Sequence, residues 1–132
     1  MSDPYHAIVW MDHREAKIFA LDGDVQYVRV ENPSGDARVH HRAGAIGSGH
    51  HRENAEYLRS VANAVAASQE IVVTGPAQAK TELVDWLKLH APQTAKRIVG
   101  IETLDHPTHG EIVAFARRYF RAIDRMTPQI PS

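Results

Sequence analysis

The chain has 132 residues, of which 43% are hydrophobic and 23% are charged. It contains no apolar run near the roughly 20 residues that cross a bilayer, so we expect one soluble globular domain over residues 1–132 and no membrane contact. The formal net charge of -1 excludes the strongly basic field of a general nucleic-acid-binding protein, so any recognition of anions must be local.

The sequence has no cysteine. This excludes disulfides, thiolate catalysis and every zinc site that depends on cysteine. The first five residues, Met-Ser-Asp-Pro-Tyr, lack the charged and apolar regions of a signal peptide. We therefore expect a cytoplasmic protein.

Three segments with strand patterns come first. Residues 6–11 are an apolar, β-branched run typical of a strand buried on both faces, and residues 16–21 resume the pattern after a short polar turn. An Asp-Gly turn signal in residues 22–24 precedes a third, alternating segment at 25–30. These segments predict a three-stranded antiparallel meander.

Helical periodicity follows in the second half of the chain. Apolar residues recur there at intervals of three and four, which is typical of amphipathic helices. A Thr-x-x-Glu capping box at Thr108 and Glu111 marks the start of the last helix, which we expect to end near residue 126. The predicted helices cover about residues 53–67, 76–90 and 109–126.

Two short apolar segments, 70–74 and 97–101, predict strands between these helices. The proline-containing residues 127–132 predict a frayed tail. The resulting order, β-β-β-α-β-α-β-α, predicts an α/β fold with a mixed five-stranded sheet, in which the later strands run parallel through right-handed crossovers.

A basic segment rich in glycine and histidine separates the meander from the helical half. It has no acidic residue between Asp36 and Glu53, and residues 39–52 hold three glycines and four histidines. Such a segment cannot bury enough apolar surface to offset the entropy of ordering it, so we expect an exposed loop over residues 35–52. Long exposed loops in compact domains are more often functional than accidental.

Two stretches and the loop between them carry a resemblance to a known family. Residues 9–19 (VWMDHREAKIF), the glycine-rich loop leading into a helix, and residues 71–83 (IVVTGPAQAKTEL) resemble the middle domain of eukaryotic and archaeal peptide-chain release factors and of their Pelota relatives. The resemblance covers about residues 5–126 and is best from Gly75 to Leu83. The chain also resembles small bacterial stand-alone proteins described as translational machinery components. The resemblance implies an RNase H-like three-layer fold.

The resemblance also implies a role for the loop. In release factors, the loop before the first helix carries a Gly-Gly-Gln motif, which enters the ribosomal peptidyl transferase centre and promotes hydrolysis of peptidyl-tRNA. Here the nearest triplet is Ser48-Gly49-His50, and the loop contains no glutamine. The resemblance therefore implies a ribosome or tRNA as partner and leaves release activity open.

The loop supplies most candidate RNA-binding residues. Arginines suit phosphate contacts, glycines allow close backbone approach, and a histidine can orient water or transfer a proton near neutral pH. His50 is the candidate catalytic residue. The last helix adds an arginine-rich face that is either a second RNA-facing patch or a solvated face balanced by acids such as Asp124. The candidates are Arg38, Arg42, Gly47, Ser48, Gly49, His50, His51, Arg52, Arg117 and Arg121.

Two other classes of function stay open. One is a hydrolase, acting on peptidyl-tRNA through His50 or as a two-metal nuclease through Asp12, Asp105 and Glu111. Each of these three carboxylates also has a structural explanation: a hairpin turn, a loop before proline and the capping box. The other class is a protein-interaction module without RNA binding, which the near-neutral charge suits.

No metal and no cofactor is predicted. The loop histidines lack the i, i+4 spacing with a glutamate that zinc proteases use. The segment from Gly75 to Lys80 lacks the phosphate-loop pattern, so we interpret it as a tight connection between strand and helix. The sequence leaves the oligomeric state open.

Overall fold

The computed structural model describes residues 5–33 and 48–126, with the backbone alone for 48–53 and 125–126. The meander is formed by β1 (His6–Met11), β2 (Glu15–Ala20) and β3 (Gln26–Glu31). After it come α1 (Ser48–Val65), β4 (Glu70–Gly75), α2 (Ala79–His90), α3 (Pro92–Ala95), β5 (Ile98–Thr103) and α4 (His109–Met126). All five predicted strands and all three predicted helices are present.

The five strands form one mixed sheet in the order β3-β2-β1-β4-β5. β1 is antiparallel to β2, and β2 is antiparallel to β3, whereas β1 and β4, and β4 and β5, pair in parallel. The parallel pairs require crossover connections, which α1 and α2 with α3 supply. The predicted mixed sheet with parallel later strands is confirmed.

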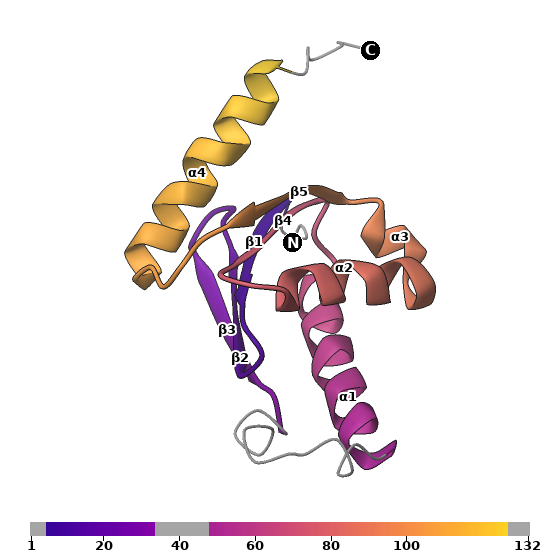
Figure 1. The fold of residues 1–132 in the computed structure, drawn as a ribbon. Helices are drawn as coiled ribbons and strands as arrows, with labels where there is room; N and C mark the ends of the chain where they lie inside the picture. Colours follow the sequence, from indigo (N-terminus) through magenta and orange to yellow (C-terminus); the bar gives the residue numbers. More distant parts are fainter. Residues whose placement is uncertain (1–4, 34–47, 127–132) are drawn as a thin grey trace.

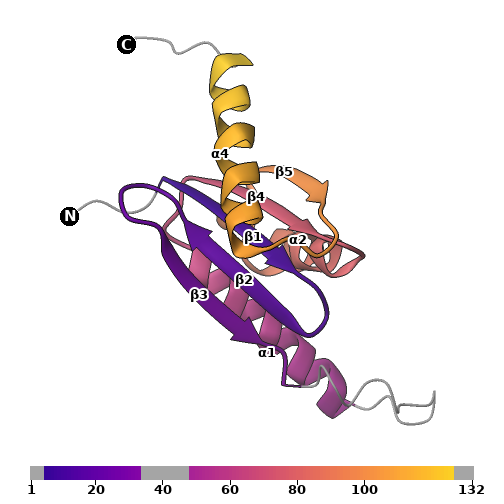
Figure 2. The ribbon, with the colours of Figure 1, turned by 90° about the vertical axis from the view of Figure 1, so that its left-hand side faces the viewer.

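The helices cover both faces of the sheet, so the fold has three layers (Figure 1). Helices α1 and α2 lie on one face, and α4 crosses the other face, with its C-terminal part extending beyond the sheet (Figure 2). The predicted three-layer α/β architecture is therefore confirmed. None of the helices in the described part of the chain is both long and apolar enough to cross a membrane.

Each face of the sheet has its own core, because side chains alternate between faces along a strand. On the α1 and α2 face, alternate strand residues such as Val9, Ile71 and Val73 pack with Tyr57, Val61 and Leu83. On the α4 face the buried residues are Ile8, Trp10, Phe19, Leu21, Val72, Ile112, Ala116 and Phe120. The central strand β1 is buried on both faces, as its apolar run predicts.

The helices differ from the expectation at three places. Helix α2 begins at Ala79, three residues later than the expected start at 76, so Pro76 precedes the helix. Helix α1 begins at Ser48, about five residues earlier than expected, so the backbone of 48–52 is helical where a loop was expected; the rest of the predicted loop, residues 35–47, lies outside the described residues. Serine is a favoured residue at a helix start, and no proline follows it before Glu53. Helix α3 was not expected, since the second predicted helix ends at about residue 90. Pro92 occupies the first turn of this short helix, where its missing N–H costs nothing.

Candidate functional site

The predicted loop leaves the sheet at Asn32, directly after β3. The Asn32 amide N–H donates to the carbonyl of Arg14 at 2.9 Å, and its side-chain Nδ2 donates to the carbonyl of His13 at 2.8 Å. Asn32 is buried, so these bonds are made away from competing water. The residue before the loop is thereby fixed to the turn between β1 and β2.

The chain returns from the loop through α1, which is tied to the same turn. The Tyr57 hydroxyl donates to the carbonyl of Asp12 at 2.8 Å, and Asn54 Oδ1 accepts from Asn32 Nδ2 at 3.4 Å. Burial, followed by the negative charges of Asp12 and Glu15, raises the pKa of Tyr57 far above its ordinary value, so the phenol stays a neutral donor. Both ends of the predicted loop are therefore held at one place, the 12–15 turn.

Asp12 is a structural residue of this turn. Its Oδ1 accepts the backbone N–H of Arg14 at 2.8 Å and of Glu15 at 3.0 Å, which is an Asx turn. Asp12 thus has the turn role that its position in the sequence suggested, and the carboxylate is engaged with the backbone.

The other two carboxylates of the nuclease hypothesis are also engaged locally. Glu111 accepts the Thr108 backbone N–H at 2.8 Å, and Thr108 Oγ1 accepts the Glu111 N–H at 3.1 Å, which confirms the capping box. Asp105 pairs with the neighbouring His106 ring at 3.0 Å. Within residues 5–33 and 48–126, Asp12, Asp105 and Glu111 do not gather into a metal-ligand group, so the described structure gives the two-metal nuclease no support.

The candidate RNA-binding residues of the loop are only partly described. Arg38, Arg42 and Gly47 lie outside the described residues. Ser48, Gly49, His50, His51 and Arg52 form the start of α1, whose first turn carries no acidic residue. The backbone N–H groups at this end are those that a helix leaves unpaired, and the helix dipole makes the end positive.

Arg117 and Arg121 lie at a different place. Both are exposed on α4, one turn apart, and line a pocket of about 270 Å³ together with His6, Leu21, Asp22, Phe120 and Asp124. Two carboxylates share this pocket with the two guanidinium groups, so the pair does not form an isolated positive patch.

The two candidate regions lie at opposite ends of the central strand. His6, in the pocket, is the first residue of β1, and Asp12, in the turn that Asn32 and Tyr57 contact, follows its last. A strand of six residues spans about 20 Å. The structure therefore does not bring Arg117 and Arg121 together with the start of α1.

The connection after β4 is structural, as interpreted from the sequence. A Cβ atom at Gly75 would lie 2.1 Å from the carbonyl oxygen of Met11, so only glycine fits there. Lys80 is buried, and its ammonium group donates to the carbonyl of Ala77. The ammonium group of Lys80 is therefore engaged with the preceding backbone and is not available to bind an anion.

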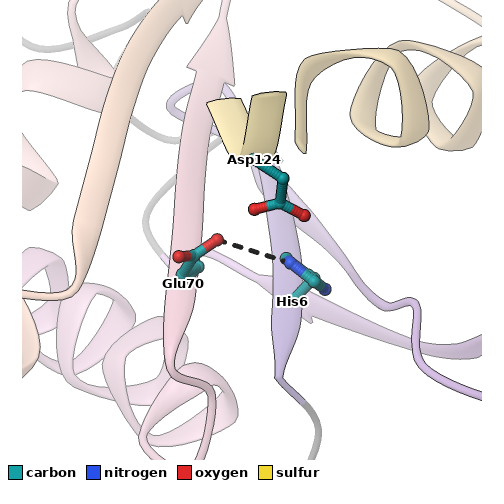
Figure 3. A group of neighbouring side chains, drawn as sticks. All are labelled: His6, Glu70 and Asp124. Carbon is teal, nitrogen blue, oxygen red and sulfur yellow. Dashed lines mark ion pairs between the residues drawn. The ribbon is translucent and has the colours of Figure 1, made fainter. Parts of the chain in front are cut away.

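One cluster of polar residues escaped the sequence reasoning. At the pocket end of the sheet, His6 Nδ1 lies 3.2 Å from Asp22 Oδ1, and His6 Nε2 lies 3.4 Å from Glu70 Oε1. Asp124 reaches the same place from α4 (Figure 3). Burial alone would raise the pKa of Asp22, but hydrogen bonds from the backbone and ring of His6 and from the backbone of Tyr5 outweigh it and hold that pKa below its ordinary value.

No protein-family model and no curated protein matches the sequence, but solved structures do. Pelota of Archaeoglobus fulgidus matches 95% of this chain and 33% of its own, with a TM-score of 0.62 and 16% identity. Pelota of Thermoplasma acidophilum matches 94% and 40%, with a TM-score of 0.56 and 18% identity. The archaeal translation termination factor aRF1 matches 92% and 38%, with a TM-score of 0.54 and 16% identity.

The chain thus spans between 33% and 40% of the length of these three proteins. At such low identity the likeness is one of fold. The chain has the α/β fold of the middle domain of archaeal release factors and Pelota, as the sequence resemblance predicted.

Proposed function

We propose that this protein is a translation-related factor that binds a ribosome or tRNA and engages RNA through residues 35–52. Arg38, Arg42 and Arg52 contact phosphates, and the glycines, including Gly47 and Gly49, allow close backbone approach. Ser48, His50 and His51 supply further polar contacts. Arg117 and Arg121 form a weaker, separate contact.

The fold is one support for this proposal. One of the matching structures is described as an archaeal translation termination factor. The resemblance noted in the sequence places a functional loop of release factors directly before the first helix, and in this chain the basic segment has that place, between β3 and α1.

The observation that carries the proposal is the way the ends of the segment are held. Asn32 on one side and Tyr57 on the other are hydrogen-bonded to the same 12–15 turn. A segment that presents basic residues to a large polyanion benefits from such fixed ends, because a rigid base limits the entropy lost on binding. The positive N-terminus of α1 adds favourable charge where the segment ends.

Co-sedimentation with purified ribosomes on sucrose gradients tests the proposal. The first variant reverses charge at Arg38, Arg42 and Arg52 to glutamate. Its matched control reverses three exposed cations elsewhere, Lys88, Lys96 and Arg118, so both variants change the net charge equally. A third variant, Arg117→Glu with Arg121→Glu, tests the α4 pair.

The expected result is that the first variant loses most ribosome binding at moderate salt, the control keeps it, and the α4 variant loses less than the first. Three phosphate contacts make affinity fall steeply with salt, so the wild-type protein should dissociate as salt rises and the first variant should show a shallower dependence. Equal binding by the first variant and the wild type would reject the segment as the RNA contact. Failure of the wild type to bind ribosomes or tRNA would favour the protein-interaction module.

A further inference from the structure

His6, Glu70 and Asp124 form a cluster of possible metal ligands at the end of the sheet opposite the basic segment. His6 and Glu70 are register partners on the parallel strands β1 and β4, and Asp124 comes from the C-terminal part of α4. One ligand atom from each of the three lies within 4.8 Å of the other two. Figure 3 shows the three side chains directed toward one another.

Two atoms of this cluster lack the partners that burial demands. His6 Nε2 and Glu70 Oε1 are out of contact with solvent, and neither has a hydrogen-bond partner in the described part of the chain. Buried polar atoms without partners are rare in folded proteins and call for an explanation. The imidazole is also held firmly, since its ring packs 4.5 Å from that of Phe120.

The tautomer of His6 places two hydrogen-bond acceptors opposite each other. Asp22 Oδ1 lies 3.2 Å from Nδ1 and can only accept a hydrogen bond, so Nδ1 carries the proton. In the neutral ring, Nε2 then has a lone pair that faces the carboxylate oxygen of Glu70, and two acceptors oppose each other. A cation between them removes the conflict, and a carboxylate on the far ring nitrogen is the usual support of a metal-binding histidine.

We propose that His6, Glu70 and Asp124 bind one zinc ion, with Asp22 orienting the imidazole. Two ligand atoms that each lie about 2.1 Å from a tetrahedral ion are about 3.4 Å apart, which matches the 3.4 Å between Nε2 and Oε1. Asp124 is exposed, so its side chain can close the remaining distance. One imidazole and two carboxylates are a donor set that zinc accepts, and the two carboxylate charges balance the ion.

Three protein ligands leave the fourth position of a tetrahedral ion open. The pocket of about 270 Å³ that His6 and Asp124 line lies on this side, and Arg117 and Arg121 line it as well. A water molecule or a small anion can reach the ion from this pocket.

The competing explanation of the two unpartnered atoms is a proton on Nε2, which would make His6 a cation paired with Asp22 and Glu70.

Zinc titration of chelator-stripped protein against a competing fluorescent chelator distinguishes a bound zinc ion from a proton on His6 Nε2. Imidazoles of the basic segment can also bind zinc nonspecifically, so the background is a variant with His40, His41, His50 and His51 changed to alanine. In that background, Glu70→Gln and Asp124→Asn each remove one ligand with little change in shape. Glu56→Gln, at an exposed position on α1, removes the same charge elsewhere.

One zinc ion per chain is expected in the background variant and in Glu56→Gln. Glu70→Gln and Asp124→Asn should each weaken binding at least about ten-fold, since even indirect supports of a metal ligand are worth that much. Zinc should raise the thermal unfolding midpoint by several degrees, and Asp124→Asn should reduce that rise. Wild-type zinc affinity in Asp124→Asn, or loss of all tight binding in the background variant, would overturn the proposal in favour of the proton.

Discussion

The hydroxyl of Tyr57 donates a hydrogen bond of 2.8 Å to the backbone carbonyl of Asp12. This contact joins α1 to the turn that follows the central strand, across 45 positions of sequence. Only 2% of Tyr57 is exposed, and a phenol so deeply buried needs a partner for its hydroxyl. The hydroxyl of this buried tyrosine therefore ties the middle of α1 to the 12–15 turn.

Replacing Tyr57 with phenylalanine should lower the free energy of unfolding by about 1 kcal/mol, because the ring packing stays and one buried hydrogen bond is lost. Urea unfolding measures this as a lower midpoint with an unchanged slope. Tyr27→Phe is the matched control, since that ring is 41% exposed on the edge strand β3, and it should change stability by less than about 0.5 kcal/mol. Equal effects of the two substitutions would contradict the role assigned to Tyr57.

The raised pKa of Tyr57 predicts how stability depends on alkaline pH. Burial, then the charges of Asp12 and Glu15, keeps the folded phenol neutral, whereas in the unfolded chain it ionises near pH 10. Its contribution is complete below that pH and is lost above it, by about 1.4 kcal/mol per pH unit. Urea unfolding at pH 9 and pH 11 should show this fall in the wild type and a smaller one in Tyr57→Phe. Identical falls would show that other groups cause the dependence.

Alanine at Gly75 should destabilise the protein by at least about 2 kcal/mol. The new Cβ would lie 2.1 Å from the carbonyl oxygen of Met11, and φ at Gly75 is +157°, a value that side chains disfavour. The obstacle is backbone of the central strand, which cannot move aside cheaply. Gly110→Ala is the control, because the nearest atom to its Cβ is 4.0 Å away and alanine suits a helix; thermal unfolding should show a loss only at Gly75.

Much of this architecture could be predicted because it depends on local patterns. The apolar run from His6 to Met11 gave the exact bounds of β1, and the spacing of Leu58, Val61 and Val65 identified the buried face of α1. Tyr57 and Phe120 were missed as core residues. An aromatic residue at the border of an apolar stripe gives no signal of its own, and its burial depends on how the helix is rotated against the sheet.

The cluster at His6 could not have been predicted in the same way. Residue 70 fell within a predicted strand, 70–74, and Asp124 was interpreted as an acid that balances arginines; both interpretations are sound locally. The cluster exists because β1 and β4 pair with His6 opposite Glu70 and because α4 ends above them. Strand register and the position of a crossing helix are tertiary properties, and the periodicity of apolar residues in the sequence does not predict them.

Replacing Thr108 with alanine should lower the free energy of unfolding by about 1 kcal/mol, the usual effect of losing a helix N-cap. Thr108 Oγ1 accepts the N–H of Glu111, whose carboxylate accepts the N–H of Thr108, so both halves of the capping box are weakened. Chemical denaturation measures the change. Thr81→Ala, at an exposed position in α2, is the control and should leave stability unchanged or slightly higher; a loss as large as that at Thr108 would argue against the cap.

Binding of peptidyl-tRNA without its hydrolysis is the expected behaviour of the proposed function. The resemblance noted in the sequence implies a glutamine in the loop before the first helix for release activity, and residues 35–52 of this chain contain none. His50 lies at the start of α1 and is the candidate base for taking a proton from water. Without that glutamine, we expect His50 by itself to leave the ester bond intact.

Release of labelled peptide from peptidyl-tRNA measures this directly, alone and on ribosomes. The wild type, His50→Ala and the neighbouring control His51→Ala should all remain at the spontaneous rate, while the charge reversal at Arg38, Arg42 and Arg52 removes binding. Turnover by the wild type that His50→Ala abolishes and His51→Ala preserves would establish the hydrolase instead. Because that result would leave the sedimentation of the charge-reversed variant unaffected, binding and catalysis by the segment are tested separately.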